Sequence, residues 1–382
     1  MSPKGAVYVW AWIILMTFPL AGNAVAADII FKPSIEVEES YDSNPTLGSV
    51  QNAKEDYITS VMPKIEFYLQ EKVLSLNCSY GLNSRYYSNK PGLNYVSHSG
   101  NVAIKMDISE RTSLSLSDSL SYTKDSREAD DIGIQTNQTG IFSNTVLLGL
   151  NQRLNKLTTI TLRGSDSFSK FDDTGFIDSR TDSAGVDVIR ELTPFRSVNA
   201  SYTYTNFVFE NSVQNSSNAN SFQLGILERL TKDISLNLAG GTVYSSDFGS
   251  KYDWSAQTSL SKKSEKSVIS IGYSRGVTTS SGLTDEINIS DRGTMVWSQT
   301  LNKNLNAILS GVYSENHTEP TSSVKLKSYD AAIRTDWTPD PLIRIGIGYS
   351  RFQQWAEGPL GNDYTRDIVS VSVTALSDGW RF

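Results

Sequence analysis

The chain has 382 residues, with 34 basic and 41 acidic side chains and a mean hydropathy of −0.29. A formal net charge of −7 argues against nucleic acid as a partner. Beyond its first residues the sequence has no run of eighteen apolar residues, so it offers no transmembrane helix. Its single cysteine, Cys78, excludes an internal disulfide and a cysteine-based metal site.

The first 26 residues predict a secretory signal peptide. Lys4 precedes an apolar run that extends from Ala6 to Leu20, and Ala24-Val25-Ala26 forms a small-residue cleavage pattern. We therefore expect residues 1–26 to be removed. Residues 27–382 should form one domain, because no shift of composition and no linker divides them. An uncleaved membrane anchor is the alternative interpretation of the same segment.

Most of the remaining chain alternates apolar and polar residues in short stretches. Between Val102 and Ile108 every second residue is apolar, and Lys105 and Asp107 fall on the opposite face. The same pattern occurs between Ile343 and Ser350. A helix would need apolar residues three and four apart, so the pattern predicts β-strands with one apolar and one polar face.

The connections between these stretches are alternately short and long. Eight tight turns are expected at Gln70–Lys72, Glu110-Arg111, Asn155-Lys156, Leu192–Pro194, Thr231-Lys232, Lys263–Lys266, Asn302–Asn304 and Thr338–Pro341. Nine longer polar loops are expected at residues 42–54, 88–94, 125–138, 171–177, 211–218, 247–251, 280–286, 317–322 and 357–362. The loops are rich in Gly, Asn, Asp and Ser, as connections usually are.

Eight turns and nine loops imply about eighteen strands, with an error of two either way. The fold that needs this pattern is an all-β, transmembrane, antiparallel up-and-down β-barrel, which places alternate side chains against lipid and in its lumen. An even strand number returns both chain ends to the periplasmic side of a Gram-negative outer membrane. A soluble β-sandwich or a propeller is a weaker alternative, because the connections are too regular for one and a forty-residue repeat is missing for the other.

Two segments break the alternation. Asp118 shares a face with four apolar residues, which predicts either a position near the membrane rim or a bulge that shifts the register. Ser377–Gly379 puts Trp380 and Phe382 out of phase with Val373, unless a bulge restores the phase. The terminal pair Trp380 and Phe382 is also the candidate signal for the barrel-assembly machinery.

Tyrosines recur near the loop-side ends of the predicted strands. Their ring and hydroxyl suit the headgroup zone of a membrane, which predicts an aromatic girdle at that level. The residues are Tyr80, Tyr122, Tyr202, Tyr204, Tyr244, Tyr273, Tyr313 and Tyr349.

The polar face predicts a water-filled lumen with many hydroxyls, amides and mixed charges. Its candidate charged residues are Lys64, Glu66, Lys105, Asp107, Arg163, Arg334, Asp336 and Arg344. Such a lining suits a neutral or weakly charged hydrophilic solute such as a sugar, although any aqueous lumen must be polar. The loop at 125–138 is long enough to fold inward. His98 and His317 stand alone, so we expect no enzyme activity, no metal site and no cofactor.

A short motif carries a family resemblance. Tyr41-Asp42-Ser43-Asn44-Pro45 follows the first strand, and Val61-Met62-Pro63-Lys64-Ile65 follows in a strand that contains a proline. These segments resemble the β-barrel porins found in exopolysaccharide gene clusters. The resemblance implies an outer-membrane channel for exopolysaccharide secretion, with a polysaccharide as cargo and in some cases a periplasmic polysaccharide-export protein as a neighbour. It assigns no functional residue to this chain.

Three functions remain open from the sequence. Exopolysaccharide export is the first, a general diffusion porin for small hydrophilic solutes is the second, and a structural or surface-display barrel without conductance is the third. In each case the expected partners include outer-membrane lipid and the barrel-assembly machinery, but no nucleic acid.

Overall fold

The computed structural model describes residues 28–49, 52–125, 134, 139–210, 216–245, 247, 251–357 and 363–381. Apart from one 3₁₀ turn, η1 (Pro91–Leu93), the regular elements of these residues are all strands. They are β1 (Asp28–Asp42), β2 (Asp56–Gln70), β3 (Leu74–Tyr87), β4 (Tyr95–Ser109), β5 (Thr112–Thr123), β6 (Ile141–Arg153), β7 (Thr158–Phe171), β8 (Ser179–Thr193), β9 (Arg196–Phe209), β10 (Ser216–Arg229), β11 (Ile234–Tyr244), β12 (Tyr252–Lys263), β13 (Ser267–Thr279), β14 (Ile287–Asn302), β15 (Leu305–Glu319), β16 (Lys325–Asp340), β17 (Ile343–Glu357), β18 (Tyr364–Leu376) and β19 (Trp380–Arg381).

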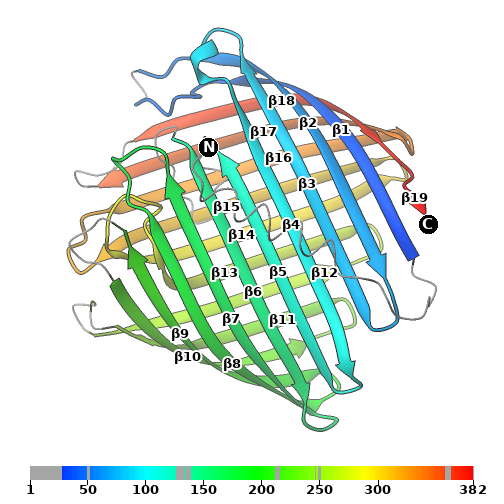
Figure 1. Cartoon of the computed structure of the whole chain (residues 1–382), viewed down its shortest axis with the longest axis vertical. Helices are drawn as coiled ribbons and strands as arrows, with labels where there is room; N and C mark the ends of the chain where they lie inside the picture. The colour runs from blue at the N-terminus through cyan, green and yellow to red at the C-terminus, as the bar shows by residue number, and fades with distance from the viewer. Residues whose placement is uncertain are drawn as a thin grey trace, which may run out of the picture.

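The strands form one closed barrel. Each pairs antiparallel with the next strand in sequence, and β1 pairs with both β2 and the last strands, β18 and β19. Because β18 and β19 follow one another along β1, they count as one strand of the wall. The barrel therefore has eighteen strands, which confirms the predicted strand number and topology. Figure 1 shows the tilted strands forming the wall, with β1 beginning beside β19 at the turn side. Among the described residues, no helix has the length and apolar character needed to cross a membrane.

A bulge joins β18 to β19. Ser34 pairs with Leu376 and Phe31 with Trp380, so three residues on one strand face two on the other. Gly379 adopts a φ of +83°, a conformation that favours glycine. The extra residue returns Trp380 to the outward face, where its ring stacks on Phe31 at 5.4 Å. The bulge predicted from the broken alternation is therefore confirmed, while Phe382 lies outside the described residues.

All eight predicted turns and all nine predicted loops fall at the junctions between the strands that they were expected to join. Side chains within the turns accept hydrogen bonds from backbone N–H groups and so stabilise the turn conformation. The Asn155 Oδ1 atom accepts a hydrogen bond from the Leu157 N–H at 2.9 Å, and the Asp340 Oδ1 atom accepts one from the Leu342 N–H at 2.9 Å. Asn and Asp favour turns for this reason. The turn sequences thus set where each hairpin ends.

The two faces of the wall differ as the alternation predicted. Ile347 and Val371 pair across β17 and β18 and are 55% and 49% exposed on the outward face, where lipid would cover them. Serines and threonines are common at the inward positions, as along β5, where every inward residue from Ser113 to Thr123 is one or the other. Asp118 is an exception, because β5 runs without a register shift against β6 and keeps this carboxylate on the outward face. The bulge alternative for Asp118 is therefore wrong. Its carboxylate accepts a hydrogen bond from Asn144 Nδ2 at 2.6 Å.

The predicted tyrosines lie on the outward face. Tyr122 and Tyr244 lie at the loop-side ends of β5 and β11, but Tyr80, Tyr273 and Tyr349 lie six positions after the turn-side starts of β3, β13 and β17, near mid-strand, so the position expected from the sequence holds only in part. Several of these tyrosines donate to carboxylates that lie closer to the loops. The hydroxyl of Tyr273 donates to Asp291 at 2.5 Å, and that of Tyr349 donates to Asp367 at 2.8 Å. In each pair the apolar tyrosine ring lies toward the turn side of the barrel and the charged carboxylate lies toward the loop side. This order matches the passage from hydrocarbon to headgroups.

We expect Gly241→Ala to impair barrel formation. A Cβ atom at Gly241 would overlap the Phe222 carbonyl oxygen, and backbone cannot move aside as a flexible side chain would. The free energy of unfolding should fall by roughly 1–3 kcal/mol, as for other overpacked positions. Heat-dependent gel mobility in a urea series measures it. Gly276→Ala is the matched control, because a Cβ atom at this inward glycine of β13 would meet no atom within 4 Å. Equal loss in both variants would contradict the steric explanation.

Candidate functional site: the closed outer mouth

The buried apolar side chains gather at the loop-side end of the barrel. One cluster joins residues of β9, β10, β11 and β14, and three smaller clusters involve β2 to β4, β16 and β17 to β18. Their members include Ile58, Tyr87, Phe207, Phe209, Ile287, Leu326, Phe352 and Tyr364. Two of these clusters join segments that are not neighbours in the barrel, since one brings β14 to β9–β11 and another brings Ile134 to Val324 and Leu326, whereas the other two join neighbouring strands.

The loop between β13 and β14, residues 280–286, lies at the centre of these contacts. The Ile177 N–H, from the loop after β7, donates to the Gly282 carbonyl oxygen at 2.9 Å. Leu283 packs against the cluster of Ile134, Val324 and Leu326. Because β7 and β13 are six strands apart in the barrel order, these contacts cross the mouth rather than join neighbouring hairpins.

Gly282 explains how this loop approaches its neighbours so closely. Its φ of +80° favours glycine, and a Cβ atom there would lie 2.6 Å from the Phe171 ring. The first residues of β14 are also covered on both faces, since Ile287, Asn288 and Ile289 are 0%, 0% and 4% exposed in succession. In a strand that only lined a wall, every second residue would face outward. The tip of this hairpin therefore lies beneath other segments.

Glu286 ties the same loop to the connection between β15 and β16. Its carboxylate accepts hydrogen bonds from the Thr321 N–H at 3.1 Å, from the Thr321 hydroxyl at 2.5 Å and from the Ser323 hydroxyl at 2.8 Å. Burial by itself raises the pKa of Glu286, but these donors outweigh burial and lower the pKa below its usual value. The carboxylate therefore stays ionised and keeps its donors at neutral pH.

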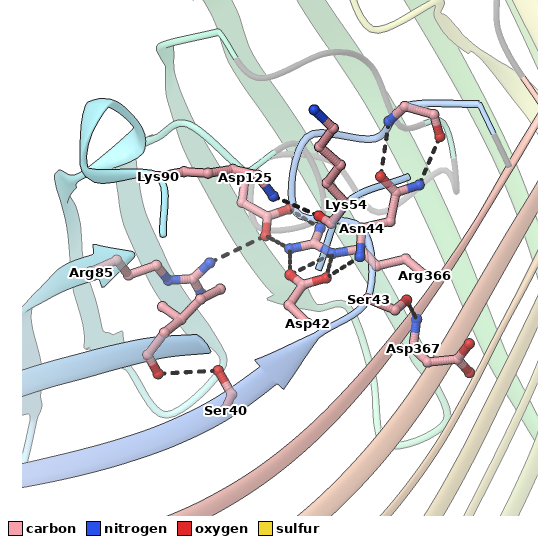
Figure 2. A network of polar contacts seen from close by, with 12 residues as sticks. Ser40, Asp42, Ser43, Asn44, Lys54, Arg85, Lys90, Asp125, Arg366 and Asp367 are labelled. Carbon is pink, nitrogen blue, oxygen red and sulfur yellow. Dashed lines mark hydrogen bonds and ion pairs between the residues drawn. The ribbon is translucent and has the colours of Figure 1, made fainter. Parts of the chain in front are cut away.

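A buried ionic network lies at the loop-side end of the seam between β1 and β18. Arg366, on β18, is 2% exposed and lies between two carboxylates, as Figure 2 shows. Its Nη2 atom lies 2.7 Å from Asp42 Oδ2 and 3.1 Å from Asp125 Oδ2. The Arg85 Nη1 atom reaches the same Asp125 oxygen at 3.2 Å. Two guanidinium groups thus compensate two carboxylates, a balance that buried charges require.

This network joins the barrel seam to the start of the loop after β5. Asp42 ends β1 and Arg366 belongs to β18, so their ion pair connects the first strand of the barrel to the last. Asp125 follows β5 and reaches the pair from farther round the wall. The predicted inward fold of the 125–138 loop is therefore observed for Asp125 and Ile134, while residues 126–133 and 135–138 lie outside the described part of the chain.

Asn44 fixes the loop that follows Asp42. Its Nδ2 atom donates to the Gly48 carbonyl oxygen at 2.7 Å and to the Thr365 carbonyl oxygen at 3.2 Å, and its Oδ1 atom accepts from the Gly48 N–H at 3.0 Å. The Asn44 N–H in turn donates to Asp42 Oδ1 at 3.0 Å. Both Asp42 and Asn44 are 0% exposed. Two residues of the Tyr-Asp-Ser-Asn-Pro motif therefore hold the mouth together.

Below this network a cavity of about 650 Å³ opens along the wall formed by β17, β18 and β1 to β5. Its border includes the charged residues Lys32, Glu36, Lys64, Glu66 and Arg344, and many hydroxyl groups. The Lys64 Nζ atom lies 2.6 Å from Glu66 Oε1. The cavity offers hydrogen-bond donors and acceptors with nearly balanced charge, which suits a hydrophilic solute.

The eight predicted lumen residues occupy inward register positions, but they do not form one site. Lys64, Glu66 and Arg344 border the cavity. Arg334 lies beside it, with Nε 2.9 Å from Asp336 Oδ1 and Nη2 3.3 Å from Glu36 Oε1. The remaining three residues, Lys105, Asp107 and Arg163, lie toward the turn side of β4 and β7, where Arg163 pairs with Asp187. Contact of any of the eight with a solute stays a prediction, as does the assembly role of Trp380.

The alternation of the sequence does not single out Arg366 and Arg85 as site residues. Asp42 belongs to the Tyr-Asp-Ser-Asn-Pro motif, and Asp125 begins the loop that was expected to fold inward. Alternation alone does not show which inward charged side chains lie close together. The pairing of Arg366 with Asp125 joins residues that are 241 positions apart in the sequence. Only the closed barrel brings them together.

Neither histidine belongs to the ionic network around Arg366. The Tyr80 hydroxyl and His98 Nδ1 are 2.8 Å apart on the outward face, and the Tyr122 ring lies 6.4 Å from the His98 ring. His317 belongs to β15. Within the described ranges, no three His, Cys, Asp or Glu side chains are placed to hold a metal ion.

The closed barrel, with its apolar outer belt and polar interior, has the architecture of an outer-membrane β-barrel. Residues 25–183 match the model of the family described as putative beta-barrel porin 2, which confirms the predicted family resemblance over that part of the chain. No curated protein matches the sequence.

Solved barrels resemble the fold at low sequence identity. The outer membrane protein opdK from Pseudomonas aeruginosa is 10% identical, with a TM-score of 0.48 over 91% of this chain and 99% of that chain. The siderophore receptor PirA from Acinetobacter baumannii is 8% identical, with a TM-score of 0.48 over 91% of this chain and 80% of that chain. These likenesses concern architecture alone.

We expect Arg366→Gln to destabilise the barrel strongly. The substitution leaves the Asp42 carboxylate buried without its cation, and breaking a buried pair in this way costs roughly 3–5 kcal/mol. The urea concentration at the midpoint of unfolding, followed by tryptophan fluorescence in detergent, measures the effect. Arg163→Gln is the control, because the Arg163 side chain is 52% exposed and its pair with Asp187 should contribute less than about 1 kcal/mol. A midpoint for Arg366→Gln no lower than that of the control would refute the role of the network.

Proposed function

We propose that this protein is an outer-membrane channel that takes part in exopolysaccharide export and that its outer mouth must rearrange for cargo to pass. The observation that carries the proposal is the set of cross-mouth contacts made by residues 280–286, Ile177, Ile134 and Val324 at the loop-side end of a barrel that also holds a polar cavity. The polysaccharide as cargo rests on the motif that contains Asp42 and Asn44. The proposal includes no catalytic step.

The closed mouth favours regulated passage over free diffusion. A general diffusion porin needs a permanently open water path, whereas here apolar side chains such as Leu326 and Phe352 are 1% and 2% exposed at the outer end. A secretion channel benefits from closure, because an open pore wide enough for a polymer would also admit harmful solutes. The hydroxyl-rich cavity supplies the hydrogen bonds that sugar hydroxyls exchange with water.

A general diffusion porin remains the second candidate. The lumen lining supports it, because hydroxyl groups and a nearly balanced set of charges around Lys64, Glu66 and Arg344 would suit any small hydrophilic solute. It requires that the wild-type channel conduct ions steadily. A surface-display barrel would instead conduct in neither the wild-type nor the opened form.

We expect Leu283→Asp to increase conductance several-fold over wild type in planar bilayers. A carboxylate at this position cannot stay ionised among Ile134, Val324 and Leu326 without moving the loop into water. Leu147→Asp is the matched control, since Leu147 lies at an inward position of β6, is 49% exposed and is not part of the mouth. A wild-type channel that already conducts as well as the Leu283 variant would contradict the closed mouth and favour the diffusion porin.

Deletion of the gene tests the cargo. We expect surface exopolysaccharide, measured by staining and by sugar analysis of the culture, to fall while uptake of small solutes is unchanged. Complementation with wild type should restore export, and complementation with the Leu283→Asp variant should also make cells sensitive to large antibiotics that the outer membrane normally excludes. Unchanged exopolysaccharide after deletion would reject export as the function.

A further inference from the structure

The outward face of the barrel has a second hollow that the channel function does not use. This groove has a volume of about 630 Å³ and lies across β8, β9, β10 and β11. Its lining includes Val188, Ala200, Leu224, Leu238 and Gly240, with Arg190 at one end. Apart from Arg190 and Asn199 the lining is apolar, which differs from the polar cavity inside the barrel.

The register places the groove on the membrane side of the wall. Val188 pairs with Ala200, Ala200 with Leu224, and Leu224 with Gly240, so these residues form one row with a common face. Arg190, Val198, Ile226 and Leu238 form the adjacent row on the same face. Val188, Leu224 and Leu238 are 36%, 57% and 46% exposed, as residues that contact lipid should be when the protein is considered alone.

Two small residues create the hollow. Ala200 and Gly240 alternate with Val188 and Leu224 along one row, so large side chains stand on either side of a low floor. A Cβ atom at Gly240 would meet only the Ser255 carbonyl oxygen, at 3.8 Å, so steric constraints in the wall do not require glycine here. The small residues therefore lower the floor of an open, apolar groove on either side of Leu224.

The groove lies near the turn side of the barrel. Gly240, six positions after the start of β11 at Ile234, is the lining residue farthest from its turn. At about 3.4 Å per residue this is roughly 20 Å along a tilted strand. In outer-membrane barrels the short turns face the periplasm. The groove therefore opens toward the acyl chains of the periplasmic leaflet.

Arg190 stands at the end of the groove closest to the turns. It is exposed, and within the described part of the chain no carboxylate lies within ion-pair distance of it. The neighbouring cation at the rim, Arg196, is already paired with Glu228, with Nη2 3.0 Å from Oε1. Arg190 therefore offers its charge to an anion at the level where lipid phosphates lie.

We propose that the groove across β8 to β11 binds one glycerophospholipid of the periplasmic leaflet, with an acyl chain in the groove and the phosphate at Arg190. The charge complementarity of Arg190 and the apolar floor at Ala200 and Gly240 select this occupant over a second protein chain, which would need partners for a wider surface. The site is independent of the proposed export function, because it lies on the outer wall, away from the residues that close the mouth.

Native mass spectrometry of the purified full-length barrel, incubated with phosphatidylglycerol in mild detergent, tests the proposal. The wild type should retain one phosphatidylglycerol. Gly240→Leu and Ala200→Phe fill the groove and should reduce the lipid-bound fraction at least fivefold. Arg190→Gln should reduce it about fivefold, since one cation near anionic headgroups contributes about 1 kcal/mol.

Two outward substitutions away from the groove serve as controls. Ala331→Phe on β16 adds the same bulk, and Lys262→Gln on β12 removes an outward cation, so both should bind lipid like wild type. Heat-dependent gel mobility confirms that every variant is folded. Equal lipid retention in groove variants and controls would overturn the proposal. A wild-type dimer that Ala200→Phe converts to a monomer would overturn it in favour of a second copy of the chain.

Discussion

The structure depends on one constraint, which is that every backbone N–H and C=O group within the hydrocarbon must have a partner in the protein. The pairing of β1 with β18 and β19 meets it by leaving no open edge. The register shift at Ser377–Gly379 lets this last seam close while Trp380 keeps its ring on the lipid side. The alternation of side chains, the outward tyrosines and the polar interior all follow from that closure.

Closing the sheet into a barrel also leaves the lumen with an opening at the loop-side end. Eighteen strands enclose a wide lumen, and without further contacts this lumen would be a permanently open pore through the membrane. Two kinds of contact hold chain segments together at this end. Apolar contacts around Leu283 and Leu326 exclude water, whereas the pairs of Arg366 with Asp42 and Asp125 hold the seam through buried charge. A network of buried ions has strict geometry, so it can define one closed arrangement more sharply than apolar packing can.

The motif residues acquire a physical meaning from this arrangement. Asp42 and Asn44 are not placed to touch cargo in the cavity. Asp42 binds Arg366, and Asn44 binds the Gly48 and Thr365 backbone, so these contacts fasten the first strand to the last. The motif that carries the family resemblance therefore contains residues that connect β1 to β18. The charged residues that border the cavity, such as Lys64 and Arg344, lie outside this motif.

The sequence by itself determined the strands, the turns and the two faces of the wall, because these depend on local alternation and on turn residues such as Asn155 and Asp340. It also indicated the bulge before Trp380, since the phase of alternation is a local property. Only the tertiary structure decided which inward charges pair, that Asp118 stays outward beside Asn144, and that the tip of β14 is buried on both faces. The reason is that such contacts join residues from strands distant in sequence, and their meeting depends on barrel curvature and on loop paths that alternation does not encode.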